Sequence, residues 1–399
     1  MILDYILQYP FKSLLYMERL VNDGSPSLFS FKYTTSRETC PLYTSQFKIC
    51  AMNDPSPDEI EDVGVLPAEF NVELNNVFFL HPDWRNVSVD FQIDTLDLYV
   101  SPTSSSRTVR ALWSDYYIKL CYPGILGRIT RELRKEHILS SIDVTRVLSD
   151  LIKRNNCPEK LSFFPEWGGR LYHHEFFDMG FVIRAASPYG NTAQKVKAII
   201  PAFSLFSIDK ESNDLPIIVQ MLNRQSKPID YILEQLIYPI IDIFFYCLLQ
   251  GGLLLEMHSQ NFLVGIDNNA DIITIILRDL ESVDKDMTII DDLNLEIKLQ
   301  SYPYKCICSE QYNYLIKHSF MYDHKLGEYF LDQLINCLVK YRLTKLGKIE
   351  NLISVYVKRN YGHFLDLFPN GVWYKFSNVL IDRSSERRPY ISYQNPKYR

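Results

Sequence analysis

The stretch that decides the fold of this chain is Leu255-Glu256-Met257-His258-Ser259-Gln260-Asn261-Phe262-Leu263-Val264, and Arg278-Asp279-Leu280-Glu281 follows it. The apolar residues 236–255 predict a buried helix, whereas 262–266 and 272–277 predict two strands joined by a turn over 267–271. Polar side chains gathered between a buried helix and a hairpin need partners, because unsatisfied buried polar groups are costly. This pattern is typical of a site for a metal ion and phosphates, or else of a hydrogen-bonded core loop.

The composition of the 399 residues predicts a folded intracellular enzyme. Apolar residues make up 47% and charged residues 23%, a balance that argues against long disorder. The net charge of −6 argues against a nucleic-acid-binding protein, because such proteins carry a basic surface. The eight cysteines are scattered, and the first residues lack the basic region of a secretory signal, so we expect reduced thiols in the cytoplasm. Asp242 and Gln250 interrupt the apolar segment, which favours a core helix over a membrane span.

The order of patterns along the chain predicts an α+β fold with a site between its parts. Strand-like patterns occupy residues 77–80, 88–93, 96–100, 108–112 and 116–121. Helical spacing follows at 125–137 and 144–155, with Asp143 as the predicted N-cap of the second helix. After Pro228 the patterns are chiefly helical, so we expect a helix-rich C-terminal half.

A second polar cluster is Pro102-Thr103-Ser104-Ser105-Ser106-Arg107-Thr108. Hydroxyls and backbone amides beside an arginine can hold phosphate or carboxylate oxygens, and a guanidinium does so with two hydrogen bonds. Lys119 lies twelve residues after Arg107, and Arg131 lies twelve residues after Lys119. A serine-rich turn of this kind is also typical of a solvated loop, so this cluster alone leaves both interpretations open.

Together the two clusters resemble the siderophore synthetases that work without a peptide-synthetase template, the aerobactin-synthetase type. That family carries a Ser-x-Arg-Thr phosphate loop, a Lys and an Arg at regular spacing, and later Glu-x-His-x-Gln-Asn and Arg-Asp. The matching residues here are Ser105, Arg107, Thr108, Lys119, Arg131, Glu256, His258, Gln260, Asn261, Arg278 and Asp279. His81-Pro82-Asp83-Trp84 matches a His-Pro-Trp segment of the family, and Asn395-Pro396 matches its C-terminal Asn-Pro. Glu166 and Arg184 match weaker positions in between, so the resemblance runs from about residue 77 to the end.

The resemblance implies a cupped-hand fold of thumb, fingers and palm. Residues 1–70 would be a shortened thumb, 71–205 a mixed α/β fingers domain, and 206–399 a helix-rich palm. The family precedent is an ATP- and Mg²⁺-dependent ligase that adenylates a carboxylate, such as citrate or a related polycarboxylate or amino acid. An amine or hydroxyl then attacks the activated carbonyl. The implied partners are these small molecules, with no nucleic acid or membrane, and the chain would work in the cytoplasm as a monomer unit or homodimer.

The same resemblance assigns roles to individual residues. The implied catalytic residues are Arg107, Lys119, Arg131 and His258. The implied nucleotide contacts are these four together with Ser105, Thr108, Gln260 and Asp279. The implied Mg²⁺ ligands are Glu256, Asn261 and Asp279, which offer the oxygen donors that a hard cation prefers. The implied substrate contacts are Lys32, His81, Lys375 and Arg388, the last beside Arg387.

Departures from the family pattern leave the substrate open. Residues 24–32 keep Lys32 but place Ser25 and Leu28 where the family has histidines, and Gly127 replaces a hydroxyl residue. The acceptor or polyacid is therefore expected to differ from the usual citrate chemistry. One alternative is a nucleotide- or polycarboxylate-binding relative without turnover. Another is a kinase-like phosphotransferase, although Gln260 stands where those enzymes need an aspartate.

Overall fold

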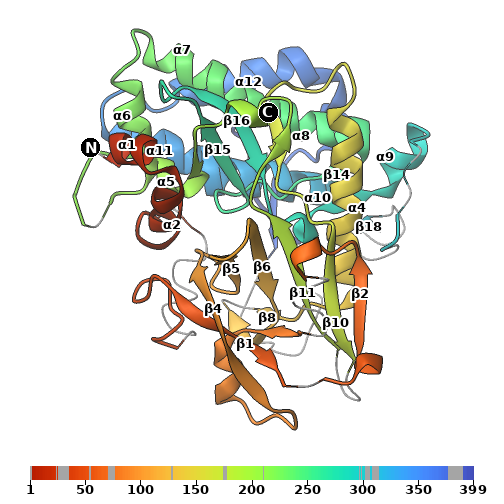
Figure 1. Ribbon diagram of the computed structural model, residues 1–399. Coiled ribbons are helices and arrows are strands. Elements are labelled where there is room, and N and C mark those ends of the chain that lie inside the picture. The colour runs from red at the N-terminus through yellow and green to blue at the C-terminus, as the bar shows by residue number, and fades with distance from the viewer. Residues whose placement is uncertain are drawn as a thin grey trace.

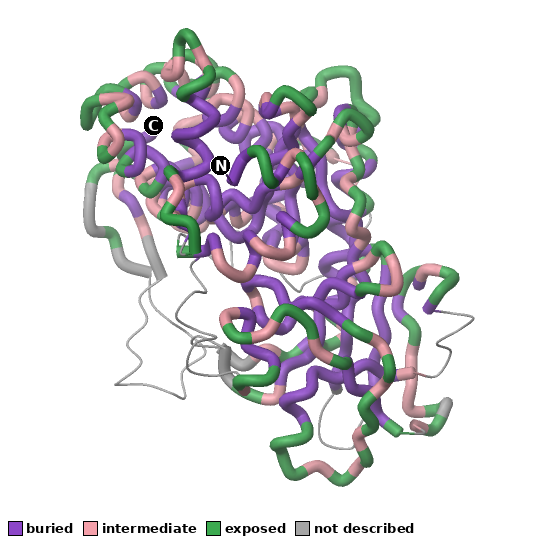
Figure 2. The backbone as a smooth tube through the Cα atoms, turned by 60° about the vertical axis from the view of Figure 1, so that its left-hand side comes forward, coloured by how far each residue is buried: buried purple, intermediate pink, exposed green. Residues whose placement is uncertain are grey.

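The structure is a computed structural model in which two lobes meet. It describes residues 2–23, 25, 36–53, 55–70, 77–126, 129–173, 178–209, 211–295, 297, 299–301, 306–307, 314–375 and 390–399. One lobe is built on a large sheet, and the other gathers most of the helices around β15 and β16 (Figure 1). Buried residues fill the interior of both lobes, and exposed residues lie on the outer turns (Figure 2). This arrangement confirms the predicted α+β class.

An eight-stranded sheet forms the first lobe, and every neighbouring pair in it is antiparallel. Its strand order is β2-β10-β11-β6-β5-β4-β1-β3. The strands are β1 (Phe47–Met52), β2 (Ile60–Gly64), β3 (Phe79–Leu80), β4 (Ile93–Pro102), β5 (Thr108–Ala111), β6 (Tyr116–Leu120), β10 (Gly168–His173) and β11 (Asp178–Ala185). A separate short hairpin, β7 (Tyr122–Leu126) and β8 (Ile129–Arg131), follows β6 directly.

A five-stranded sheet with the order β12-β9-β16-β15-β13 lies in the second lobe. Its strands are β9 (Leu161–Phe163), β12 (Tyr189–Gly190), β13 (Ala198–Pro201), β15 (Phe262–Ile266) and β16 (Ile272–Leu277). The predicted hairpin over residues 262–277 is therefore confirmed, with Phe262 opposite Leu277. Two smaller sheets join β14 (Leu253–Leu254), β17 (Asp284–Asp286) and β18 (Cys306–Ile307), and β19 (Val372–Lys375) with β20 (Tyr390–Gln394).

Helices surround this second sheet and bury the largest apolar cluster of the molecule. They are α1 (Ile2–Gln8), α2 (Pro10–Leu20), α4 (Lys135–Ile152), α5 (Ala202–Phe206), α6 (Ile217–Leu222), α7 (Pro228–Ile232), α8 (Tyr238–Gly251), α9 (Met287–Asp292), α10 (Tyr314–Ser319), α11 (Asp332–Lys340) and α12 (Lys348–Tyr361). π-helical segments Leu233–Ile237 and Phe320–Leu331 connect α7 to α8 and α10 to α11.

The apolar segment predicted as a core helix is buried among these elements. The continuous helix Pro228–Gly251 is long and apolar enough to cross a membrane, with mean hydropathy 1.7, yet 67% of its most apolar window is buried. Its one carboxylate in α8, Asp242, accepts hydrogen bonds from the hydroxyls of Tyr356 and Tyr361, at 2.8 and 2.7 Å. The packing and the satisfied carboxylate support the core-helix interpretation.

The N-terminal segment contributes to both lobes. Ile2, Leu3 and Met17 of α1 and α2 belong to the core of the helical lobe, whereas β1 and β2 are strands of the eight-stranded sheet. Residues 161–163 and 189–201 likewise enter the five-stranded sheet. The chain thus crosses between the sheets more than once. Sheet membership alone does not define folding units, so the predicted boundaries at residues 70 and 205 and the thumb, fingers and palm remain predictions.

Three local predictions are wrong. Residues 88–93 are predicted as a strand, but only Ile93 lies in one, as the first residue of β4. Residues 125–137, whose spacing predicts a helix, instead supply the β7–β8 hairpin and only then enter α4 at Lys135. Tyr122 pairs with Arg131 across this hairpin, and tertiary pairing has overridden the local helical spacing. Asp143 is no N-cap but lies in the middle of α4, where it is fully buried. Its carboxylate accepts the backbone N–H groups of Gln300 and Ser301 at 2.9 Å, contacts that no local pattern could indicate.

Candidate active site

The segment after β16 brings two carboxylates to β6 and β11, neighbouring strands in the middle of the eight-stranded sheet. Lys119 of β6 is 1% exposed, and its ammonium forms ion pairs with Asp279 and with Glu281, the latter at 2.6 Å. Arg184 of β11 donates to Asp279 at 3.2 Å and to Glu166 at 2.6 Å. These ion pairs connect strands of the first lobe to the segment after β16 of the second.

Asp279 itself has an unusual backbone conformation. Its φ of 65° and ψ of 54° lie in the left-handed region, which costs a residue other than glycine about 1–3 kcal/mol. Burial raises the pKa of Asp279, but Lys119, Arg184 and Arg107 outweigh burial and hold it well below its usual range. Burial also raises the pKa of Glu281, and Lys119 and Arg107 again lower it overall. Both carboxylates are therefore anionic at neutral pH.

Two arginines extend this cluster. Arg107 follows the serine-rich loop, and its guanidinium donates to the Arg131 backbone oxygen at 3.3 Å and lies 3.5 Å from the Glu281 carboxylate. Burial and the neighbouring charge of Arg107 lower the pKa of Arg131, and Asp279 and Glu281 oppose this effect. The β7–β8 hairpin thus carries Arg131 to Arg107. The lowered pKa of Arg131 shows that the two guanidinium charges repel each other, so an anion between them would be favoured.

The serine-rich loop differs from the predicted backbone cradle. All five amides from Ser104 to Thr108 already have partners: the Glu18 carboxylate, the Thr103 hydroxyl, the backbone oxygens of residues 103 and 105, and the Ser105 hydroxyl. The loop therefore presents the side chains of Ser105 and Arg107 rather than its amides. An anion would be held here by side chains.

The turn after β14 orients an uncharged histidine. The Nδ1 atom of His258 accepts the backbone N–H of Gln260 at 3.2 Å, which assigns the ring proton to Nε2. Burial lowers the pKa of His258 to about 4, and Glu256 opposes this shift. The Nε2 atom lies 4.0 Å from the Glu256 carboxylate. His258 can therefore donate a hydrogen bond at neutral pH without carrying charge.

The predicted Mg²⁺ ligands already have protein partners. Glu256 pairs with Lys325 at 2.6 Å, the Asn261 amide donates to Ser282 at 3.2 Å, and Asp279 is bound as described. Among the described residues, no group of three His, Cys, Asp or Glu side chains is placed to hold a metal. Asp279 and Glu281 nevertheless converge on one ammonium. Their oxygen donors are of the type that suits Mg²⁺, so a hard cation fits the chemistry of this pair.

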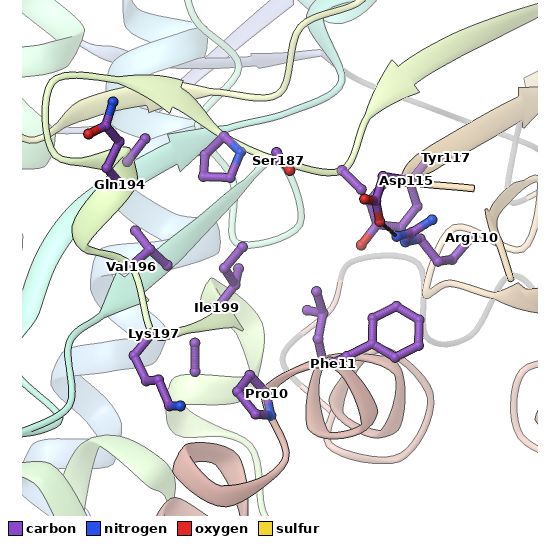
Figure 3. A pocket seen from close by; sticks show the side chains of 15 residues that line it. Pro10, Phe11, Arg110, Asp115, Tyr117, Ser187, Gln194, Val196, Lys197 and Ile199 are labelled. Atoms are coloured by element: carbon purple, nitrogen blue, oxygen red, sulfur yellow. Dashed lines mark hydrogen bonds and ion pairs between the residues drawn. The ribbon is translucent and has the colours of Figure 1, made fainter. Parts of the chain in front are cut away.

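A pocket of about 440 Å³ is lined by residues of α2, of β6 and of the segment 186–199 (Figure 3). Leu14 of α2 and Tyr117 of β6 line it, and Tyr117 lies two residues from Lys119 on the same strand. Arg110 lies in its wall with its guanidinium over the rings of Phe11 and Tyr117. That guanidinium also donates to backbone oxygens, including that of residue 116 at 3.0 Å, so it is a supported part of the wall.

No protein-family model matches the sequence, and no curated protein matches it. Solved structures do match. Aerobactin synthetase IucA from a hypervirulent pathotype of Klebsiella pneumoniae is 14% identical, and the match covers 98% of this chain and 79% of IucA with a TM-score of 0.64. Aerobactin synthetase IucC from a hypervirulent pathotype of the same species is 13% identical, and the match covers 99% of this chain and 85% of IucC with a TM-score of 0.66. This chain has the aerobactin-synthetase fold.

A third match extends the comparison beyond aerobactin. The petrobactin biosynthesis protein AsbB from Bacillus anthracis str. Sterne is 14% identical, and the match covers 88% of this chain and 68% of AsbB with a TM-score of 0.65. A structure of ATP-bound IucA matches as well, with a TM-score of 0.63. The predicted resemblance is thus confirmed for the aerobactin-synthetase fold. At 13–14% identity the likeness is one of fold, and the roles of individual residues remain predictions.

The structure brings together most residues that the sequence singled out. Lys119 pairs with Asp279, and Arg107 lies 3.5 Å from Glu281 and donates to the backbone oxygen of Arg131. The charge of Asp279 also acts on the pKa values of Arg131 and His258. The remaining predicted contacts Ser105, Thr108, Gln260, Glu256 and Asn261 lie in the same loops and turns. The two halves of the motif pattern therefore face each other across one junction in the aerobactin-synthetase fold.

The structure does not support His81 as a substrate contact, and it does not describe the other predicted substrate contacts. His81 is 0% exposed, its Nδ1 caps the short helix Pro82–Asn86, and burial lowers its pKa to about 4. A neutral histidine without solvent access is not placed to touch a dissolved carboxylate, so its position does not support this prediction. Lys32, Arg387 and Arg388 lie outside the described residues, and so does the side chain of Lys375 at the end of β19.

Two carboxylates of the site were not among the predicted site residues. Glu281 binds Lys119 and lies near Arg107, and its place two residues after Asp279 was the available signal. Glu18 of α2 is fully buried and pairs with Arg278. An acidic residue four positions after Leu14, on the buried face of an amphipathic helix, was the signal for Glu18.

Proposed function

We propose that this chain is a Mg²⁺-ATP-dependent ligase that joins a carboxylate to an amine or hydroxyl through an acyl-adenylate. The observation that carries the proposal is the cluster in which Lys119 and Arg107 pair with Asp279 and Glu281, with Arg131 bonded to Arg107 and a neutral His258 within electrostatic reach of Asp279, on the aerobactin-synthetase fold. ATP-bound IucA among the matching structures adds support for the nucleotide. We propose a cytoplasmic location on the same grounds.

In this proposal the cations exchange partners when the nucleotide binds. Lys119 and Arg107 would pass from Asp279 and Glu281 to phosphate oxygens, and these two carboxylates would hold Mg²⁺. The bound Mg²⁺ would neutralise phosphate charge. The ion pairs would hold the cations at the site before the nucleotide binds, so the exchange of partners would be complete before the chemical step begins.

The proposed reaction has two steps. A substrate carboxylate oxygen attacks the α-phosphorus of ATP, the bond to the β-phosphate breaks, and pyrophosphate leaves. Arg107 and Arg131 would offset the charge on the crowded phosphate, and His258 would donate its Nε2–H to a phosphate oxygen. An amine or hydroxyl then attacks the carbonyl carbon, loses its proton, and displaces AMP.

The test is pyrophosphate release with citrate, succinate, 2-oxoglutarate and amino acids, each with and without amines. We expect AMP and pyrophosphate in equal amounts, and a loss of about a hundredfold in rate for Arg107→Ala. Arg224→Ala is the matched control, because that arginine pairs with Asp4 on the surface, away from the site. ADP as the product would instead indicate a phosphotransferase.

A relative that binds nucleotide without turnover is the second candidate. The observation that favours it is the internal neutralisation of Lys119, which is almost fully buried and bonded to two carboxylates. Titration calorimetry separates the two candidates. Mg²⁺-ATP binding without pyrophosphate release across the whole panel would establish the binding-only function.

A further inference from the structure

Glu18 connects segments from three distant parts of the chain. It lies in α2 and is 0% exposed. One carboxylate oxygen pairs with the Arg278 guanidinium, and the other accepts the backbone N–H of Ser104 at 3.0 Å. Arg278 in turn donates from Nε to the backbone oxygen of Gln260 at 2.7 Å. One side chain thus links the serine-rich loop, the residue before Asp279, and the turn that carries His258.

The chemistry of this link favours a permanent connection. A buried carboxylate is tolerated when it is paired and hydrogen-bonded, and both Glu18 oxygens are. The ion pairs of Lys119 with Asp279 and Glu281 also join the two halves of the site, but those charges would change partners when phosphates bind. The Glu18 bridge need not change, because its two oxygens bond Arg278 and Ser104, and neither of these residues is among the implied phosphate contacts.

We propose that Glu18 is a positioning residue that sets the separation of the two halves of the nucleotide site. It acts through Ser104 on the loop that presents Ser105 and Arg107, and through Arg278 on Asp279 and His258. The N-terminal helix α2 is then an integral part of the site. The role in catalysis rests on the proposed function, whereas the mechanical link does not.

The position of α2 also explains why a small displacement of this helix would matter for the site. Leu14, one helical turn before Glu18, lines the pocket of Figure 3 beside Tyr117, and Tyr117 lies two residues before Lys119. A shift of α2 would therefore move the pocket wall and the loop together. A misplacement of about 1 Å in a site of this kind can cost about a hundredfold in rate.

The experiment compares Glu18→Gln with Glu18→Asp and with Met17→Ala. Glutamine keeps an acceptor for Ser104 but removes the charge that holds Arg278. Aspartate keeps the charge on a shorter arm and is the rescue variant. Met17 is the matched control on the same helix, because it is 0% exposed and its apolar side chain belongs to the core of the helical lobe.

Two measurements are made on the full-length chain: Mg²⁺-ATP affinity by calorimetry, and amide hydrogen exchange of peptides covering 103–108 and 258–261. For Glu18→Gln we expect affinity to fall about 10- to 100-fold and exchange to rise in both peptides, with partial recovery in Glu18→Asp. Met17→Ala should lower Tm but keep wild-type affinity for Mg²⁺-ATP. It should not raise amide exchange in the two peptides together.

The outcomes separate this inference from the proposed function. Wild-type affinity and unchanged exchange in Glu18→Gln would overturn the positioning role. Equal effects of Glu18→Gln and Met17→Ala on affinity and on both peptides would also overturn it, because the helix would then act only through stability. A wild-type chain that binds no Mg²⁺-ATP would overturn the proposed function. The exchange of the two peptides would still decide whether Glu18 fastens them together.

Discussion

Replacing Lys119 by methionine tests the centre of the proposed site. The substitution keeps the length of the side chain and removes the ammonium that Asp279 and Glu281 share. Asp279 would keep Arg184 at 3.2 Å, and Glu281 would keep Arg107 at 3.5 Å. Each carboxylate therefore retains one weaker partner, and the chain should still fold.

The expected loss of stability follows from these contacts. Removing one partner of a buried ion pair costs about 3–5 kcal/mol, and the remaining arginines favour the lower value, about 3 kcal/mol. Unfolding entropy is about 2.1 cal/mol/K per residue, which for 399 residues gives about 0.8 kcal/mol per degree. We therefore expect Tm to fall by about 4 °C.

The same substitution should change the response to acid. Lys119 helps to hold the pKa values of Asp279 and Glu281 below their usual range. Groups with depressed pKa values stabilise the fold above their unfolded pKa of about 4, and that stability is lost as the pH falls through the folded pKa. In Lys119→Met these pKa values rise, so acid unfolding should begin at a higher pH.

The assay combines calorimetric Tm, acid unfolding and pyrophosphate release. The control is Lys153→Met, which removes a surface ion pair to Asp150 with both side chains mostly exposed, at 65% and 72%. Such pairs are worth at most about 1 kcal/mol, so Tm should stay within about 1 °C. A Lys119→Met protein with wild-type Tm and wild-type turnover would refute the reasoning, since neither carboxylate would then depend on the ammonium.

Two further perturbations probe buried polar groups. Burial lowers the pKa values of His81 and His258 to about 4, below the unfolded value of about 6.5, so stability should be lost as the pH falls from 6.5 to 4, by up to about 3 kcal/mol per imidazole. The free energy of unfolding in urea, measured from pH 6.5 to pH 4, should depend less steeply on pH in His81→Asn, which keeps an acceptor for the Asp83 amide. An unchanged pH dependence would contradict the assignment of a neutral His81. Tyr361→Phe, at the end of α12, should lower the free energy of unfolding in urea by about 1–3 kcal/mol, because Asp242 of α8 loses one of its two tyrosine donors and burial already raises its pKa. Tyr329→Phe, on an exposed residue, is the control, and an equal cost for both variants would show that the Asp242 bond is not responsible.

Local patterns of this sequence were sufficient where neighbours along the chain decide the structure. The two short apolar runs 262–266 and 272–277, joined by a polar turn, predicted the β15–β16 hairpin, and the long apolar run predicted the buried helix. The ordered motifs from Ser105 to Asp279 indicated the aerobactin-synthetase fold, because several matches in the right order are far more specific than one. These signals need no knowledge of distant contacts.

The tertiary structure alone decided what joins these elements. Lys119 and Asp279 are 160 residues apart, and Glu18 and Arg278 are 260 apart, so neither pair leaves a periodic trace in the sequence. The β7–β8 hairpin replaced a predicted helix, and Asp143 was drawn into the interior by the amides of residues 300–301. The neutral state of His258 follows from burial, which depends on the whole packing. The physical reason is that local spacing reports which face of an element is buried, whereas the partner on that face is set by the assembled fold.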